Sequence, residues 1–132
     1  MKLLHIRRVY GHFRRDHVNR VESHKATVGA GDAKNGEAVF NDNCGVCHSN
    51  TKGAASKIGP NLFGVVGRKS ATFAGYMYSP AMMKANLTWD VPTLQVYLMG
   101  PQKKVPGTKM GFPGFSDPQD EADVIAYLVT LK

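Results

Sequence analysis

The chain has no apolar run that approaches the roughly 18 residues of a membrane-spanning helix, so no transmembrane segment is expected. It has no internal repeat, and no stretch of alternating apolar and polar residues predicts β-strands. Motifs typical of DNA- or RNA-binding domains are missing, so no nucleic-acid partner is expected. Cysteine is scarce, with two residues in 132. These absences predict a small protein without a β-sheet. The two cysteines are therefore the best guide to its function.

Positive charge is unevenly distributed along the chain. Residues 1–28 hold seven basic and two acidic side chains, a net charge of +5, whereas the other 104 residues have a net charge of +2. We therefore expect a basic N-terminal extension, residues 1–28, and one domain, residues 29–132. The extension lacks the apolar core of a secretory signal. Its arginines lie between apolar residues at helical spacing, which fits a targeting segment, a membrane-surface helix or a mis-assigned start, while a disordered arm fits equally well.

Helical periodicity and capping residues predict four helical segments in the domain. Asp32 and Asp117 are good N-caps, and Pro80 suits the first turn of a helix. Residues 49–75 and 100–116 are rich in glycine and other turn-forming residues, which predicts long loops. The sequence therefore predicts an all-α fold, with helices over residues 33–43, from Ser79-Pro80, over residues 88–99 and from Asp117-Pro118 onward.

Both cysteines lie in the motif Cys44-Gly45-Val46-Cys47-His48. Two thiols at this spacing fit two vinyl groups on one edge of a porphyrin, and the adjoining histidine can then bind the iron. A redox-active cysteine pair would need a βαβ context that the chain lacks. A zinc site would need four ligands, and the other histidines all lie in the first 24 residues. The motif favours one covalently attached c-type haem, bound by Cys44 and Cys47 with His48 on the iron.

A second iron ligand would decide what such a haem does. The best candidate is Met110, which ends the turn Pro106-Gly107-Thr108-Lys109-Met110. A thioether is a soft ligand that raises the reduction potential of haem iron. Methionine alone is weak evidence, because the chain has six and most methionines fill cores. The turn is what distinguishes Met110 from Met82, Met83 and Met99.

Further short stretches follow the order and spacing of one protein family: Gly36, Phe40, Gly59-Pro60-Asn61-Leu62, Gly67-Arg68-Lys69, Tyr78, Trp89, Tyr97 and Ile125-Ala126-Tyr127-Leu128. With them, residues 31–132 resemble the class I cytochromes c of the mitochondrial and alphaproteobacterial type. The resemblance implies a small fold in which the terminal helices cross and long loops wrap round one covalently bound haem.

The resemblance also implies roles for individual residues. His48 and Met110 would be the axial ligands, and the carbonyl of Pro60 would accept a hydrogen bond from the second nitrogen of His48. Gly36 would allow close approach of the two terminal helices. The remaining pocket residues would surround the haem, several of them near its propionates: Arg68, Tyr78, Trp89, Tyr97 and Thr108.

Two features depart from the family pattern. Met82 occupies a position near the haem where asparagine is usual, which offers a second thioether. Asn43, Gln102 and Ser116 replace lysines around the exposed haem edge. The resemblance implies that partners dock on the lysines that remain: Lys52, Lys57, Lys103, Lys104 and Lys109.

Taken with the residues, the resemblance implies a monomeric one-electron carrier rather than an enzyme. Partners would be redox proteins with acidic docking patches, such as a cytochrome bc1-type complex, a cytochrome oxidase or a periplasmic dehydrogenase. The bacterial periplasm is the expected compartment, with the mitochondrial intermembrane space as the alternative. The rival function is a haem-based ligand sensor or peroxidase-like protein from which Met110 dissociates.

Overall fold

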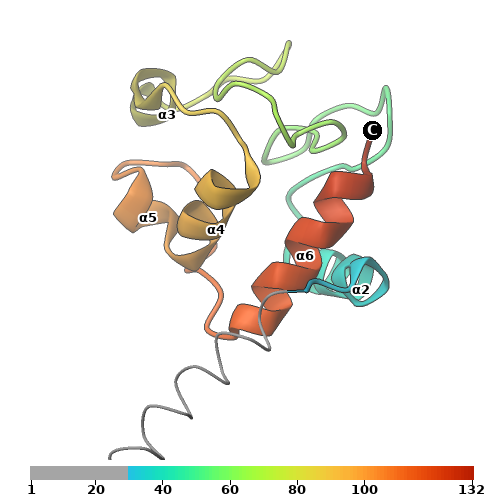
Figure 1. Ribbon diagram of the computed structural model, residues 1–132. Helices are drawn as coiled ribbons and strands as arrows, with labels where there is room; N and C mark the ends of the chain where they lie inside the picture. Colours follow the sequence, from blue (N-terminus) through green and yellow to red (C-terminus); the bar gives the residue numbers. More distant parts are fainter. Residues whose placement is uncertain (1–29) are drawn as a thin grey trace, which may run out of the picture. The chain divides into compact units, whose positions relative to one another are not determined.

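The computed structural model describes residues 30–132, so the predicted extension, residues 1–28, lies outside the described part. Gly31–Lys132 form one compact unit. In this unit the only β-type pairing is an isolated antiparallel bridge between Lys69 and Thr88. The all-α prediction is confirmed (Figure 1), with helices α2 (Ala33–Asn43), α3 (Pro80–Ala85), α4 (Val91–Met99), α5 (Pro101–Lys104) and α6 (Pro118–Thr130).

Side-chain caps fix where most of these helices begin. The Asp32 carboxylate accepts hydrogen bonds from the first turn of α2, and the Asp117 carboxylate does the same for α6. The predicted start of α4 was three residues too early. The Asp90 side chain caps α4 by accepting from the Thr93 N–H, and Thr88 is extended because it pairs with Lys69.

The chain between Gly100 and Ser116 is mostly loop, as predicted, but it includes one short helix. Gly100 ends α4, and Pro101 then begins the four-residue α5. Proline is favourable there because the first helical residue has no partner for its N–H. The consequence for the site is that α5 lies immediately before the turn that carries Met110.

Helices α2 and α6, which are far apart in the sequence, pack side by side (Figure 1). Phe40 is 1% exposed, and its ring centroid lies 5.5 Å from that of Tyr127. Gly36 is buried directly against the backbone of Asp123. The close crossing predicted for the terminal helices is therefore present, and it depends on the missing side chain at Gly36.

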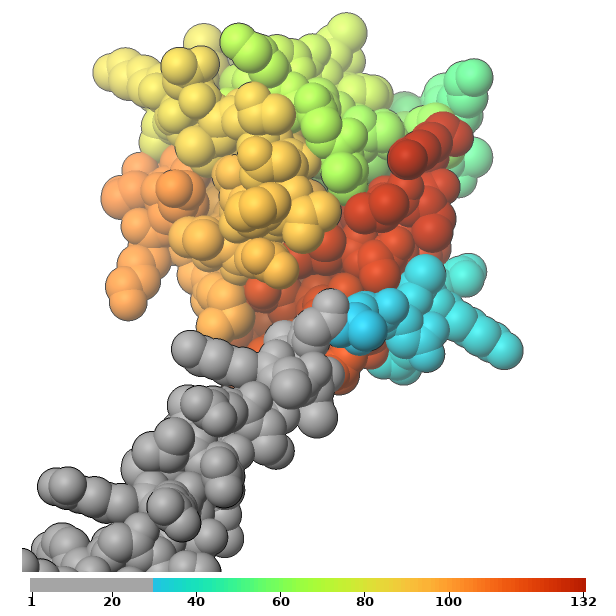
Figure 2. All heavy atoms as spheres, in the orientation of Figure 1, coloured from blue at the N-terminus to red at the C-terminus, as the bar shows by residue number. Residues whose placement is uncertain are grey.

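A buried carboxylate ties these two helices together. Asp123 is 2% exposed, and its oxygens accept hydrogen bonds from the Asp32 N–H at 2.8 Å and the Asn35 amide at 2.6 Å. The Gln119 amide donates a third bond at 2.8 Å. In Figure 2 the atoms of α6 lie between those of α2 and α4, which agrees with the contacts of α6 to both helices. Helix α6 therefore packs against both α2 and α4 and joins them into one core.

The long segment after the cysteine motif is irregular but well bonded. Asn61, 1% exposed, donates through its amide to the carbonyls of Thr51 and Ala54 and accepts from the Phe63 N–H. This one side chain closes the loop that presents Pro60. Of the helices between residues 30 and 132, none has the length and apolar character needed to span a bilayer.

Candidate functional site: a haem pocket

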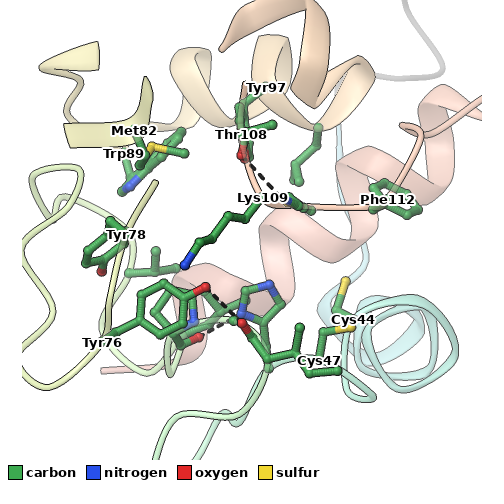
Figure 3. A pocket seen from close by; sticks show the side chains of 18 of the residues that line it. Cys44, Cys47, Tyr76, Tyr78, Met82, Trp89, Tyr97, Thr108, Lys109 and Phe112 are labelled. Carbon is green, nitrogen blue, oxygen red and sulfur yellow. Dashed lines mark hydrogen bonds between the residues drawn. The ribbon is translucent and has the colours of Figure 1, made fainter. Parts of the chain in front are cut away.

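A cavity of about 280 Å³ lies between the cysteine motif, the loops and α4. All ten side chains that the sequence predicts for haem binding line it. Figure 3 shows Cys44 and Cys47 on one side of the cavity, with Met82 and Trp89 on the other. The structure therefore brings together residues that lie up to 66 positions apart, from Cys44 to Met110.

The cysteine motif forms a tight turn at the end of α2. Cys44 is the C-cap of the helix, and its N–H donates to the Phe40 carbonyl at 2.7 Å. The N–H groups of Cys47 and His48 both donate to the Cys44 carbonyl, at 3.0 and 2.9 Å. Burial, with a smaller contribution from Cys47, raises the pKa of the Cys44 thiol to about 11. Cys44 is buried, Cys47 is half-buried, and the two do not form a disulfide.

The imidazole of His48 is held in one tautomer. Its Nδ1 lies 2.7 Å from the carbonyl oxygen of Pro60. A carbonyl only accepts, so Nδ1 carries the proton and Nε2 presents a lone pair. Burial lowers the pKa of His48, partly offset by this hydrogen bond, so the ring is neutral. A neutral imidazole with one free nitrogen is a good metal ligand.

Gly59 provides the flat surface on which this ring lies, a role the sequence analysis missed. A Cβ at position 59 would overlap the imidazole of His48. The Gly59 N–H also donates to the Cys47 carbonyl at 2.7 Å, which joins the loop to the cysteine motif. The only sequence signal was the position of Gly59 beside Pro60, and it did not indicate this packing.

The turn that carries Met110 is joined to α4 inside the pocket. The hydroxyls of Tyr97 and Thr108 are both buried and lie 2.9 Å apart. The Met110 N–H donates to the Thr108 hydroxyl oxygen at 3.4 Å. Met110 itself is partly buried and lines the cavity. A thioether and an imidazole are thus available to the same space.

At another part of the wall, polar groups point into an otherwise apolar pocket. Trp89 is 8% exposed, and no residue of the described chain accepts a hydrogen bond from its indole N–H. The Tyr78 hydroxyl accepts from the Phe73 N–H at 3.1 Å, which leaves its own proton available. Figure 3 shows Met82 beside Trp89, and Met82 lines the cavity as expected.

Arg68 is more constrained than the sequence suggested. Its guanidinium donates to the carbonyls of Asn61 and Phe63, at 3.0 and 2.6 Å, and lies over the Phe73 ring. Burial lowers its pKa, with a smaller opposing effect from Tyr78. Arg68 therefore supports the loop as well as contributing positive charge to the pocket.

The five predicted docking lysines are all exposed, and they differ in position. The Lys57 ammonium donates to the Gly45 carbonyl at 3.0 Å, beside the cysteine motif. The Lys109 ammonium donates to the Met77 carbonyl at 2.8 Å and lies over the Tyr76 ring. Lys103 and Lys104 lie on α5, and Lys52 is on the loop after His48. Of the five, Lys109 also lines the cavity.

The pocket fits haem by the chemistry of its walls. Two cysteine sulfurs, a neutral imidazole and a thioether line the same cavity, and these are the donor types that a c-type haem needs for its covalent links and its iron. The unpaired indole N–H of Trp89 and the charge of Arg68 fit anionic propionates. Within residues 30–132, no three histidine, cysteine or carboxylate side chains gather as a site for another metal ion.

Comparison with known proteins agrees with this chemistry. Residues 33–132 match the family described as Cytochrome c. The chain is 53% identical over 98 residues to cytochrome c of Gossypium barbadense, which covers 74% of this chain and 88% of that protein. It is also 51% identical over 102 residues to cytochrome c2 of Rhodopila globiformis, and this match covers 77% of this chain and 95% of that protein.

A solved structure is also similar. Cytochrome cH from Methylobacterium extorquens has a TM-score of 0.70 at 50% identity, with 76% of this chain and 99% of that chain covered. The chain therefore belongs to the cytochrome c family, and the protein is an electron carrier with one covalently bound haem c rather than an enzyme.

Proposed function

We propose that this protein, as a monomer, shuttles single electrons between redox proteins of the bacterial periplasm. Cys44 and Cys47 bind the haem through thioethers, and His48 and Met110 are its axial ligands. The main support is the geometry of His48, whose Nδ1–H is held by Pro60 so that Nε2 remains for iron. Bound haem supplies one-electron Fe(II)/Fe(III) chemistry.

The other pocket residues keep the haem in place. Tyr78, Trp89 and Thr108 donate to the propionates, and Arg68 offsets their negative charge, since burying a carboxylate without a partner is costly. The Tyr97 hydroxyl acts through Thr108, to which it is hydrogen-bonded. With both axial positions taken by protein side chains, substrate has no open site on the iron.

The exposed lysines steer acidic partners toward the haem edge: Lys52, Lys57, Lys103, Lys104 and Lys109. Candidate partners are a cytochrome bc1-type complex, a cytochrome oxidase or a periplasmic dehydrogenase. Because residues 29–132 have a net charge of only +2, this steering is weak. The rate of electron transfer to a purified oxidase should therefore fall only modestly as ionic strength rises.

The covalent assignment is tested by intact mass after acid–organic extraction of haem. The chain should retain one porphyrin, Cys44→Ser and Cys47→Ser should each form at most one thioether, and a clean apo mass would contradict the assignment. N-terminal sequencing of natively expressed protein tests the compartment, since export removes a leader peptide.

The axial assignment is tested by Met110→Ala. This variant should lose the ferric thioether-to-iron charge-transfer band and have a lower reduction potential. Double variants with Met82 and Met83 would reveal a replacement thioether. Carbon monoxide should leave the ferrous wild-type spectrum six-coordinate and unchanged, whereas ready carbon monoxide binding would favour a ligand sensor.

A further inference from the structure

The side-chain amide of Gln102, on α5, is bonded to the backbone of the turn that carries Met110. Its Nε2 donates to the Thr108 carbonyl at 2.8 Å, and its Oε1 accepts from the Gly107 N–H at 3.3 Å. The flipped amide would place its NH₂ against the Gly107 N–H and its oxygen against the Thr108 carbonyl, so only the observed orientation forms both hydrogen bonds. A single side chain thus holds two successive residues of the turn.

The turn is held from the opposite direction as well. The Thr108 hydroxyl is bonded to Tyr97 of α4 and accepts from the Met110 N–H. The Tyr97–Thr108 pair is buried, whereas Gln102 is exposed. The turn therefore has an inner attachment to α4 and an outer attachment to α5, and the outer one depends on Gln102.

We propose that Gln102 is a positioning residue that keeps Met110 on the iron by restraining this turn, and so limits the access of external ligands. The proposal rests on the axial role proposed for Met110. Met110 can leave the iron only if its turn moves away from the pocket. In this proposal the turn moves relative to α5, which breaks the bonds of Gln102 to Gly107 and Thr108.

Glutamine suits this role because it has one donor and one acceptor on a planar amide. Lysine has donors alone and leaves the Gly107 N–H unpaired. Glutamate has acceptors alone and places a charge against the Thr108 carbonyl. Because Gln102 is exposed, water competes for both bonds, so their loss is expected to make opening of the turn roughly fivefold more frequent.

The test measures how often the turn opens, in the haem-loaded protein. At saturating imidazole, the rate of imidazole binding to the ferric protein is limited by dissociation of Met110. This rate should rise roughly fivefold in Gln102→Ala, and Gln102→Lys and Gln102→Glu should also exceed wild type. Amide exchange of the Gly107 N–H, followed by NMR, should accelerate by a similar factor.

Gln95→Ala is the matched control, because Gln95 is exposed on α4 and makes no side-chain hydrogen bond to the described chain. It should behave as wild type. If wild type has the thioether charge-transfer band and Gln102→Ala equals wild type in both measurements, the role of Gln102 is wrong and the proposed function stands. If wild type lacks the band, the axial role of Met110 and this proposal are both wrong.

Discussion

Gly36 of α2 lies so close to the Asp123 carbonyl on α6 that a methyl group at position 36 would overlap it. The obstacle is backbone, which cannot move aside as a flexible side chain can. Gly36→Ala should therefore separate the two helices and lower the melting temperature by at least about 5 °C, as expected for an overpacked core.

Thermal unfolding of the haem-loaded protein checks this expectation. Gly45→Ala is the control, because a Cβ there would meet its nearest neighbour at an ordinary 3.5 Å. Equal melting temperatures for Gly36→Ala and Gly45→Ala would contradict the role given to the helix crossing.

Gly59→Ala should disturb the iron ligand, because the added methyl would overlap the ring of His48. Displacement of the ring stretches its 2.7 Å bond to Pro60. A less basic imidazole stabilises Fe(III) less, so the reduction potential should rise, and the melting temperature should fall by about 5 °C or more. Gly100→Ala, whose nearest neighbour would be 3.4 Å away, should change the potential little. A normal potential in Gly59→Ala would contradict the packing role.

Glu121 should make stability depend on pH. Its side chain is 7% exposed, and Oε2 is buried without a hydrogen-bond partner in the described chain. Burial raises the pKa of this carboxyl to about 7 from an ordinary 4.5. The folded protein therefore holds the proton more tightly than the unfolded chain, and stability is lost as pH rises from about 4.5 through 7.

Glu121→Gln removes this titration and should melt a few degrees above wild type at pH 8, with the difference shrinking toward pH 4.5. Melting curves across this range measure the effect. Glu37→Gln, at an exposed position on α2, should follow the wild-type curve. An unchanged pH dependence in Glu121→Gln would show that the buried carboxyl is not responsible.

The domain boundary remains a prediction, and a shortened chain that begins at Gly29 tests it. Residues 1–28 contain none of the proposed pocket residues, while Gly31, which packs against the Ala122 carbonyl, is kept. Exported with a borrowed signal peptide, the shortened chain should bind haem and have the reduction potential of the full-length protein. Its melting temperature should lie within a few degrees of that of the full-length protein. Failure to incorporate haem would mean that the boundary is misplaced.

Helix positions were predictable because caps and periodicity are local properties of the sequence. Asp32 and Asp117 begin α2 and α6 as expected. The cap that starts α4, Asp90, is also local, but the sequence prediction passed over it in favour of Thr88. That Thr88 is extended depends on its pairing with Lys69, a contact that no local pattern encodes.

The pocket residues were predictable where chemistry and resemblance coincide, as in the cysteine motif. The supporting residues were not. Gln102 was noticed only as a missing lysine, because its bonds depend on how α5 and the following turn fold back on one another. The burial of Glu121 likewise depends on tertiary packing, since a carboxylate in the first turn of a helix is usually at the surface.

The crossing of α2 and α6 has a consequence for how the protein is made. Cys44, Cys47, His48 and Met110 are all translated before residue 118, where α6 begins. When the ribosome has made these four residues, it has therefore not yet made the helix that packs on α2. The fold therefore cannot close on a nascent chain until α6, Pro118–Thr130, has been made. A chain cut before α6 would still contain both cysteines, His48 and Met110, but it would lack Leu128 of the pocket wall and the helix that packs on α2.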